Sequence, residues 1–232
     1  MGFYKGLAFV KPLFFMRTLL RIFFHLLYHQ FAFTYDLIAA IVSFGRWKDW
    51  IQEVVPFIEG TRTLEIGHGP GHLQRVLLNR GLVAVAIDES APMGRLAKRN
   101  TDGKAHLTRG LAQHLPFSDE SFDTVIATFP AEYIFDPATL TETYRVLKEN
   151  GRFVILPGVV ITGRRIWERF MAWLFRVTGQ TPPNLSEILR ERSKEPFAKA
   201  GFQVEVQELE VKSSTVFIVG ATKSTNAQIA ES

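Results

Sequence analysis

Short runs of mostly apolar residues alternate with helical patterns along most of this chain. The runs are rich in Val and Ile, which predicts buried strands of a parallel sheet, and they occupy residues 63–66, 82–87, 105–108, 122–129 and 152–156. Residues 72–80 and 138–147 carry apolar side chains at helical spacing, and residues 203–222 read as a terminal antiparallel pair. The pattern predicts an α/β fold with a doubly wound, mostly parallel seven-stranded sheet and an antiparallel C-terminal strand.

The first 31 residues follow a different pattern. Arg17, Arg21 and His25 fall on one stripe of a helical projection, and Phe and Leu side chains fill most of the remaining surface. A wide apolar face with a basic stripe is typical of a helix lying in a membrane interface. The interspersed charges argue against a transmembrane span or a signal peptide. We therefore expect residues 1–31 to bind a membrane surface; packing on the domain or on a partner chain in an oligomer is the alternative.

The junction of the first strand and first helix carries a glycine-rich turn. Gly67, Gly69 and Gly71 follow Glu65 at alternate positions. This spacing differs from the G-x-G-x-x-G of dinucleotide-binding loops, and an acid inside the turn repels phosphate but suits a cationic or polyhydroxyl ligand. The segment resembles motif I (E/D-x-G-x-G-x-G) of the class I S-adenosylmethionine-dependent methyltransferases, which have a Rossmann-like sheet. An ordinary glycine-rich turn is the alternative.

Two later stretches extend the resemblance at the right distances from the first. Residues 88–93 read D-E-S-A-P-M, like the family's D-x-S-x-x-M, and residues 109–123 are similar to its G-D-A-x-x-L-P-F-x-D-x-S-F-D. Residues 33–50 resemble the Y-D…S-x-G…W segment of ubiquinone/menaquinone-biosynthesis C-methyltransferases. The resemblance implies a methyltransferase that binds S-adenosylmethionine and releases S-adenosylhomocysteine.

One position departs from the family pattern. Leu111 stands where the family has an acid that bonds the adenine amino group, so the Ala112 amide and the Gln113 side chain are the remaining contacts there. Asp88 would accept hydrogen bonds from both ribose hydroxyls, and Met93 would lie against the adenine or pack in the core. The predicted cofactor contacts are Tyr35, Glu65, Gly67, His68, Gly69, Gly71, Asp88, Glu89, Met93, Ala112, Gln113 and Thr128.

The acceptor side is predicted from the segment that follows the fourth strand. Phe129, Glu132 and Tyr133 are candidates for substrate contacts, because ligands meet at the carboxyl ends of such strands. A packing role in the loop is the alternative for Glu132 and Tyr133. The resemblance implies a helical lid over residues 161–202, which contains a basic and aromatic stretch that includes Trp167; packing of these aromatics on the sheet edge is the alternative. An aromatic lid and an apolar N-terminal helix indicate a small lipophilic acceptor, a quinone precursor or a lipid, at a membrane surface. No residue stands out as a general base.

Composition narrows the partners and the compartment. The 232 residues carry a net charge of +4 and no cysteine, which excludes disulfides and thiolate metal sites; we predict no metal. The basic residues accompany apolar side chains, which suits anionic lipid better than nucleic acid. We expect a cytoplasmic protein on the inner face of the membrane. Two alternatives are a soluble methyltransferase whose N-terminal helix makes a dimer, and a non-catalytic relative that binds the cofactor.

The domain organisation follows from these assignments. Residues 32–60 are expected to form a helical cap, with one amphipathic helix over residues 47–59. The methyltransferase core is placed at residues 61–222, and the polar residues 223–232 are expected to form a disordered tail.

Overall fold

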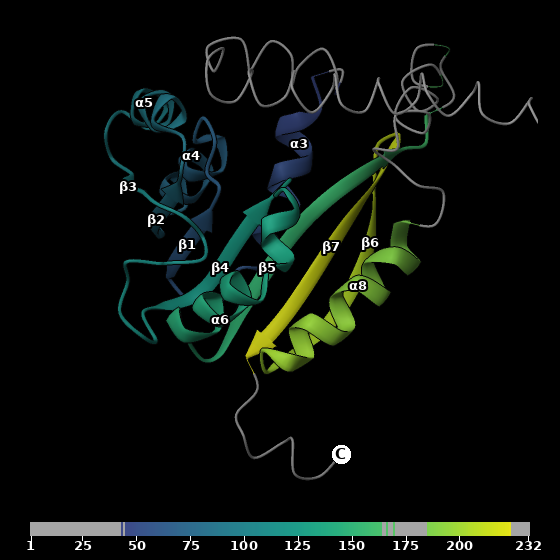
Figure 1. Cartoon of the computed structure of the whole chain (residues 1–232). Helices are drawn as coiled ribbons and strands as arrows, with labels where there is room; N and C mark the ends of the chain where they lie inside the picture. The colour runs from purple at the N-terminus through teal and green to yellow at the C-terminus, as the bar shows by residue number, and fades with distance from the viewer. Residues whose placement is uncertain (1–42, 44, 164–165, 167–168, 170–184, 224–232) are drawn as a thin grey trace, which may run out of the picture.

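A computed structural model describes residues 43, 45–163, 166, 169 and 185–223 (Figure 1). The predicted interfacial helix at residues 1–31, the cofactor candidate Tyr35 and the substrate candidate Trp167 lie outside the described residues. The same holds for residues 224–232.

Seven strands form one sheet in the order β3-β2-β1-β4-β5-β7-β6. Their bounds are β1 Arg62–Ile66, β2 Val83–Asp88, β3 His106–Arg109, β4 Phe122–Thr128, β5 Leu147–Ile161, β6 Phe202–Val211 and β7 Ser214–Lys223. Neighbouring strands from β3 to β5 pair in parallel, whereas β7 is antiparallel to both β5 and β6. The predicted doubly wound, mostly parallel sheet with an antiparallel C-terminal strand is confirmed.

Helices cover both faces of the sheet (Figure 1). They are α3 Trp47–Gln52, α4 His72–Asn79, α5 Ala91–Asn100, α6 Pro137–Val146 and α8 Leu185–Lys199, with short 3-10 helices η2 Val55–Phe57 and η3 Glu132–Phe135. Alternate residues of β4 face opposite ways, as the pleat requires. Val125 and Ala127 enter the core beneath α6 and α8, and Ile126 enters the core beneath α3 and α4.

The order of the strands defines where a ligand is expected to bind. The chain runs from β1 through β2 to β3 on one side of β1, and β4 then pairs with the other side of β1. In open α/β sheets, ligands bind outside the carboxyl ends of the strands at this reversal. The loops after β1, β2 and β4 meet there.

Local sequence signals fix where two of the helices begin. The Ser90 side chain accepts a hydrogen bond from the Met93 amide at the start of α5, and Asp136 accepts one from the Ala138 amide at the start of α6. Both helices have proline in the first turn, where its missing N–H is not needed.

Three predicted bounds were wrong. The helix expected over residues 47–59 ends at Gln52, and η2 follows with Pro56 inside it, because proline removes a helical hydrogen bond and restricts the preceding residue. The fifth strand is longer than the predicted residues 152–156, since its pairing with β7 continues to Ile161. Lys223, assigned to the tail, is the buried last residue of β7.

The expected lid also needs a correction in its described part. Helix α8, inside residues 161–202, packs on the sheet. Its Phe197 is fully buried and stacks on Phe153 of β5, with ring centroids 6.2 Å apart. This helix is part of the core layer. Most of the remaining lid segment, residues 170–184, lies outside the described residues.

Candidate active site

The turn between β1 and α4 requires glycine for two separate reasons. Gly67, Gly69 and Gly71 all have positive φ, at 74°, 50° and 81°, a region that side chains with a Cβ rarely adopt. A Cβ on Gly71 would also lie 2.9 Å from Ala97 of α5. The turn can therefore approach α5 closely and present bare backbone to a ligand.

Hydrogen bonds from β2 and α5 hold this turn in place. The Gly67 amide donates to the Ile87 carbonyl over 2.8 Å. Asn100, at the end of α5, donates its side-chain amide to the Pro70 carbonyl over 2.8 Å. The turn is thus anchored at both ends before any ligand arrives.

Asp88 joins the glycine turn to the next helix. One carboxylate oxygen accepts the Gly69 amide over 2.9 Å and the other accepts the Ser90 amide over 2.8 Å. The side chain is 5% exposed at the end of β2. A carboxylate oxygen has capacity for more than one bond, so Asp88 can hold the turn and still accept from a ribose hydroxyl.

Glu65 lies inside β1, not in the turn where the sequence analysis placed it. It is 1% exposed, and its carboxylate accepts a 2.8 Å hydrogen bond from Gln74 of α4. Burial raises the pKa of Glu65 to about 8, and the nearby Asp88 charge adds to the shift. A buried acid below the glycine turn favours a ligand that brings a positive charge.

Tyr133 closes the crevice above the glycine turn. A Cβ on Gly67 would lie 2.6 Å from the Tyr133 hydroxyl oxygen, so this hydroxyl sits directly over the turn. Burial, and then the carboxylates of Asp88, Glu89 and Glu65, raise the pKa of Tyr133. The hydroxyl therefore stays protonated and can donate a hydrogen bond.

His68 belongs to the wall of the crevice. It is buried, and its Nδ1 lies 2.7 Å from the Gly69 carbonyl oxygen. Burial lowers the pKa of His68, so the ring is neutral near pH 7 and Nδ1 donates to that carbonyl. The structure gives this predicted cofactor contact a role in shaping the turn.

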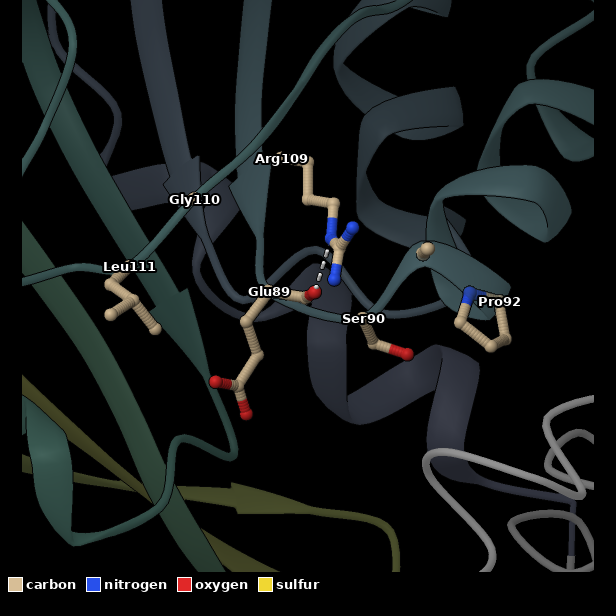
Figure 2. A pocket seen from close by; sticks show the side chains of 7 residues that line it. Glu89, Ser90, Pro92, Arg109, Gly110 and Leu111 are labelled. Carbon is tan, nitrogen blue, oxygen red and sulfur yellow. Dashed lines mark hydrogen bonds between the residues drawn. The ribbon is translucent and has the colours of Figure 1, made fainter.

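A pocket of about 540 Å³ opens beside the crevice. It is lined by Glu89, Ser90, Ala91, Pro92, Arg109, Gly110 and Leu111 (Figure 2). Leu111 is 49% exposed there. The pocket lies next to Asp88, at the place where the resemblance puts the adenine.

Met93, Ala112 and Gln113 were also predicted to contact the cofactor near this pocket. Met93 is fully buried and is not among the pocket-lining residues, which agrees with its alternative role in the core. Ala112 is buried directly after Leu111. The Gln113 side chain donates to Asp136 at the start of α6 over 3.3 Å, so its amide nitrogen faces that helix.

The acceptor side is built around the end of β4. Thr128 ends the strand, and Phe129 has φ 50°, an uncommon value for a residue with a side chain and one associated with functional sites. The Phe129 ring stacks on Trp47 of α3, with centroids 4.0 Å apart. Glu132, a substrate candidate, is exposed at the start of η3.

Two residues of the site were missed in the sequence. Gln74 reads as an ordinary polar position of α4, yet it is fully buried against Glu65. Trp47 was assigned only to the preceding cap. The position of Gln74 on the buried face of an amphipathic helix was the one signal in the sequence that could have indicated its contact. The sequence around Trp47 gives no comparable signal.

The comparisons with known proteins agree with this geometry. The model of the methyltransferase domain family matches residues 64–155. A demethylmenaquinone methyltransferase of Thermobifida fusca is 31% identical over 182 residues, covering 75% of this chain and 74% of that protein. The Thermotoga maritima demethylmenaquinone methyltransferase is 29% identical over 223 residues, covering 83% of this chain and 93% of that protein.

Solved structures share the fold. A Thermotoga maritima S-adenosylmethionine-dependent methyltransferase, described as a possible histamine N-methyltransferase, superposes with TM-score 0.57 at 20% identity, covering 86% of this chain and 99% of that one. A Haemonchus contortus phosphoethanolamine N-methyltransferase bound to S-adenosylhomocysteine superposes with TM-score 0.53 at 19% identity, covering 78% of this chain and 54% of that one.

The sheet, the glycine turn and the acid at the end of β2 together define a class I S-adenosylmethionine-dependent methyltransferase. More narrowly, the chain belongs to the methyltransferase family that contains the demethylmenaquinone methyltransferases. The residues of the crevice fit the cofactor, because the buried carboxyl of Glu65 suits its cationic part and the open backbone at Gly69 leaves room for it.

Proposed function

We propose that this methyltransferase methylates a small lipophilic acceptor, with a reduced quinone precursor as the best-supported class and a lipid headgroup as the second. The observation that carries the proposal is the similarity to the Thermobifida fusca demethylmenaquinone methyltransferase over three quarters of the chain. The half-buried rings of Trp47 and Phe129 stack on each other at the carboxyl end of β4, so the acceptor side has an aromatic lining that suits an aromatic acceptor.

The crevice divides into a cofactor side and an acceptor side. The residues proposed to hold the cofactor, Glu65, Gly67, Gly69, Gly71 and Asp88, come from β1, the turn and β2. The residues proposed to meet the acceptor, Phe129 and Tyr133, follow β4. Tyr133 lies over Gly67, at the boundary between the two sides.

The chemistry asks mainly for alignment. When bound, S-adenosylmethionine supplies an electrophilic methyl group. An electron pair of the acceptor forms the new bond to the methyl carbon, the electron pair of the carbon–sulfur bond stays on sulfur, and a carbon or hydroxyl acceptor releases one proton. Holding the two reactants in line supplies much of the rate enhancement. We assign Tyr133 to hydrogen-bond an oxygen of the acceptor, since its hydroxyl stays protonated.

A membrane surface is the proposed source of the acceptor. The basic stripe and wide apolar face of residues 1–31 support this, although these residues lie outside the described part of the chain. None of the described helices is both long and apolar enough to cross a bilayer.

Flotation of the full chain with anionic vesicles tests the surface contact. We expect the wild type to float and a Leu20→Glu/Phe23→Glu variant to stay at the bottom of the gradient. A wild type that stays at the bottom, and sediments as a dimer that is lost when residues 1–31 are deleted, would favour the alternative of a soluble methyltransferase.

Transfer of a labelled methyl group tests the acceptor class. The full chain is mixed with labelled S-adenosylmethionine and vesicles that carry either a reduced demethylated naphthoquinone or phosphatidylethanolamine, with histamine as a water-soluble control. We expect label in the organic extract of the quinol vesicles. Label in phosphatidylethanolamine would select the second lipophilic class, and label in histamine alone would overturn the proposal.

A further inference from the structure

The pocket beside α5 offers few hydrogen-bond acceptors to a ligand. The Arg109 guanidinium can only donate, and its Nε already bonds the Glu89 backbone oxygen over 3.0 Å. The Ser90 hydroxyl accepts the Met93 amide as the cap of α5, and the other lining side chains are apolar or absent. Glu89 therefore carries the main side-chain acceptor in the lining.

The Glu89 carboxylate is available to a ligand. The side chain is exposed, and it has no hydrogen bond or ion pair with any residue in the described part of the chain. In Figure 2 it extends into the space between Leu111 and Ser90. An acid and an exposed leucine thus face the same pocket from the ends of two neighbouring strands, β2 and β3.

Asp88 and Glu89 are adjacent in sequence but are held differently. Asp88 is buried, and both of its oxygens bond backbone amides of the turn and of α5. Glu89 is exposed on the pocket and has no such bonds. The first acid is therefore fixed next to the glycine turn, whereas the second lines the pocket and can bond a ligand there.

We propose that Glu89 is the residue that selects adenine, by accepting a hydrogen bond from the purine 6-amino group. Leu111 has no polar group for this role, and a carboxylate forms a charge-assisted bond that is stronger than a neutral one. The inference concerns the cofactor end of the same site and rests on the cofactor that the proposed function uses. Its test needs no acceptor, so failure of one proposal is distinguishable from failure of the other.

The test is a cycle of two proteins and two ligands, measured by calorimetric titration. The proteins are the wild type and Glu89→Met, which keeps the side-chain length but removes the acceptor. The ligands are S-adenosylhomocysteine and its analogue with hydrogen in place of the 6-amino group. Glu89→Gln keeps a neutral acceptor and serves as the intermediate variant. Glu187→Gln, an exposed acid on α8, controls for net charge.

We expect the wild type to prefer S-adenosylhomocysteine over the analogue by about tenfold, as for one charge-assisted hydrogen bond. Glu89→Met is expected to abolish this preference, Glu89→Gln to reduce it and Glu187→Gln to preserve it. An unchanged preference in Glu89→Met, or an equal loss of affinity for both ligands, would overturn the assignment. The second result would mean that Glu89 bonds the ribose, or that it acts on the ligand only through its negative charge.

Discussion

Glu65 is a carboxyl placed in the middle of a sheet, where its own charge is unfavourable. It is buried between neighbouring strands, and its carboxylate accepts a hydrogen bond from Gln74. Burial favours the neutral acid, whereas a cationic ligand favours the carboxylate. We therefore interpret Glu65 as a group whose ionisation is coupled to occupation of the crevice.

This interpretation predicts a pH-dependent stability for the ligand-free protein. The folded-state pKa of about 8 lies above the ordinary value of 4.5, so Glu65 binds its proton more tightly when folded. Its stabilising contribution is present below pH 4.5 and is lost as the pH rises through about 8, a loss on the order of a few kcal/mol. Glu65→Gln should remove that loss.

Urea unfolding at pH 5 and pH 8.5 measures the effect. The free energy of unfolding should fall more between these values in the wild type than in Glu65→Gln. Equal falls in the two proteins would mean that Glu65 titrates normally.

Tyr133 gives a second prediction at this scale. Tyr133→Phe removes only the hydroxyl, so kcat/KM for the acceptor should fall by about tenfold, the usual effect of one lost hydrogen bond. The dissociation constant of S-adenosylhomocysteine, measured by calorimetry, should change little. If cofactor affinity falls as much as kcat/KM, Tyr133 binds the cofactor and the division of the crevice is wrong.

At the scale of elements, β7 links the edge strand β6 to the rest of the sheet. It pairs with β5 on one side and β6 on the other, and it ends at Lys223. The buried Lys223 ammonium donates to the Leu147 carbonyl over 2.8 Å and lies 4.7 Å from the centre of the Tyr144 ring. These contacts fasten the end of β7 to the junction of α6 and β5.

We predict that Lys223→Met lowers the free energy of unfolding by about 1–3 kcal/mol, because it leaves a buried carbonyl without its donor. Lys199→Met is the matched control: Lys199 is exposed and pairs with Glu195 one turn away on α8, which should change stability by less than about 0.5 kcal/mol. Urea unfolding at pH 7 compares them. Equal effects would show that Lys223 does not fasten β7.

The sequence predicts those parts of the fold that depend on neighbouring residues. The glycine turn after β1 and the helix that begins near residue 138 are of this kind. The length of β5 depends on its partner β7, over fifty residues later, and the Trp47–Phe129 stacking joins residues eighty-two positions apart. Such contacts leave no local pattern to read.

At the scale of the whole molecule, the switch between β1 and β4 explains why the site lies where it does. The two apolar cores on opposite faces of the sheet hold β1 and β4 side by side. Their carboxyl ends then bring the glycine turn under the segment that carries Phe129 and Tyr133. The acceptor-side residues pack on these cores, Tyr133 on one and Phe129 on the other, so the sheet itself fixes where the two sides of the site meet.

The central claim is that this crevice binds S-adenosylmethionine, and calorimetric titration with S-adenosylhomocysteine tests it most directly. We expect a dissociation constant on the order of micromolar for the wild type. Binding should be lost in Gly67→Leu, which fills the space below Tyr133, and in Asp88→Ala, which releases the turn. Gly103→Ala, another glycine with positive φ but with open space around it, is the control and should retain binding. Wild-type affinity in both Gly67→Leu and Asp88→Ala would contradict the account and place the cofactor elsewhere.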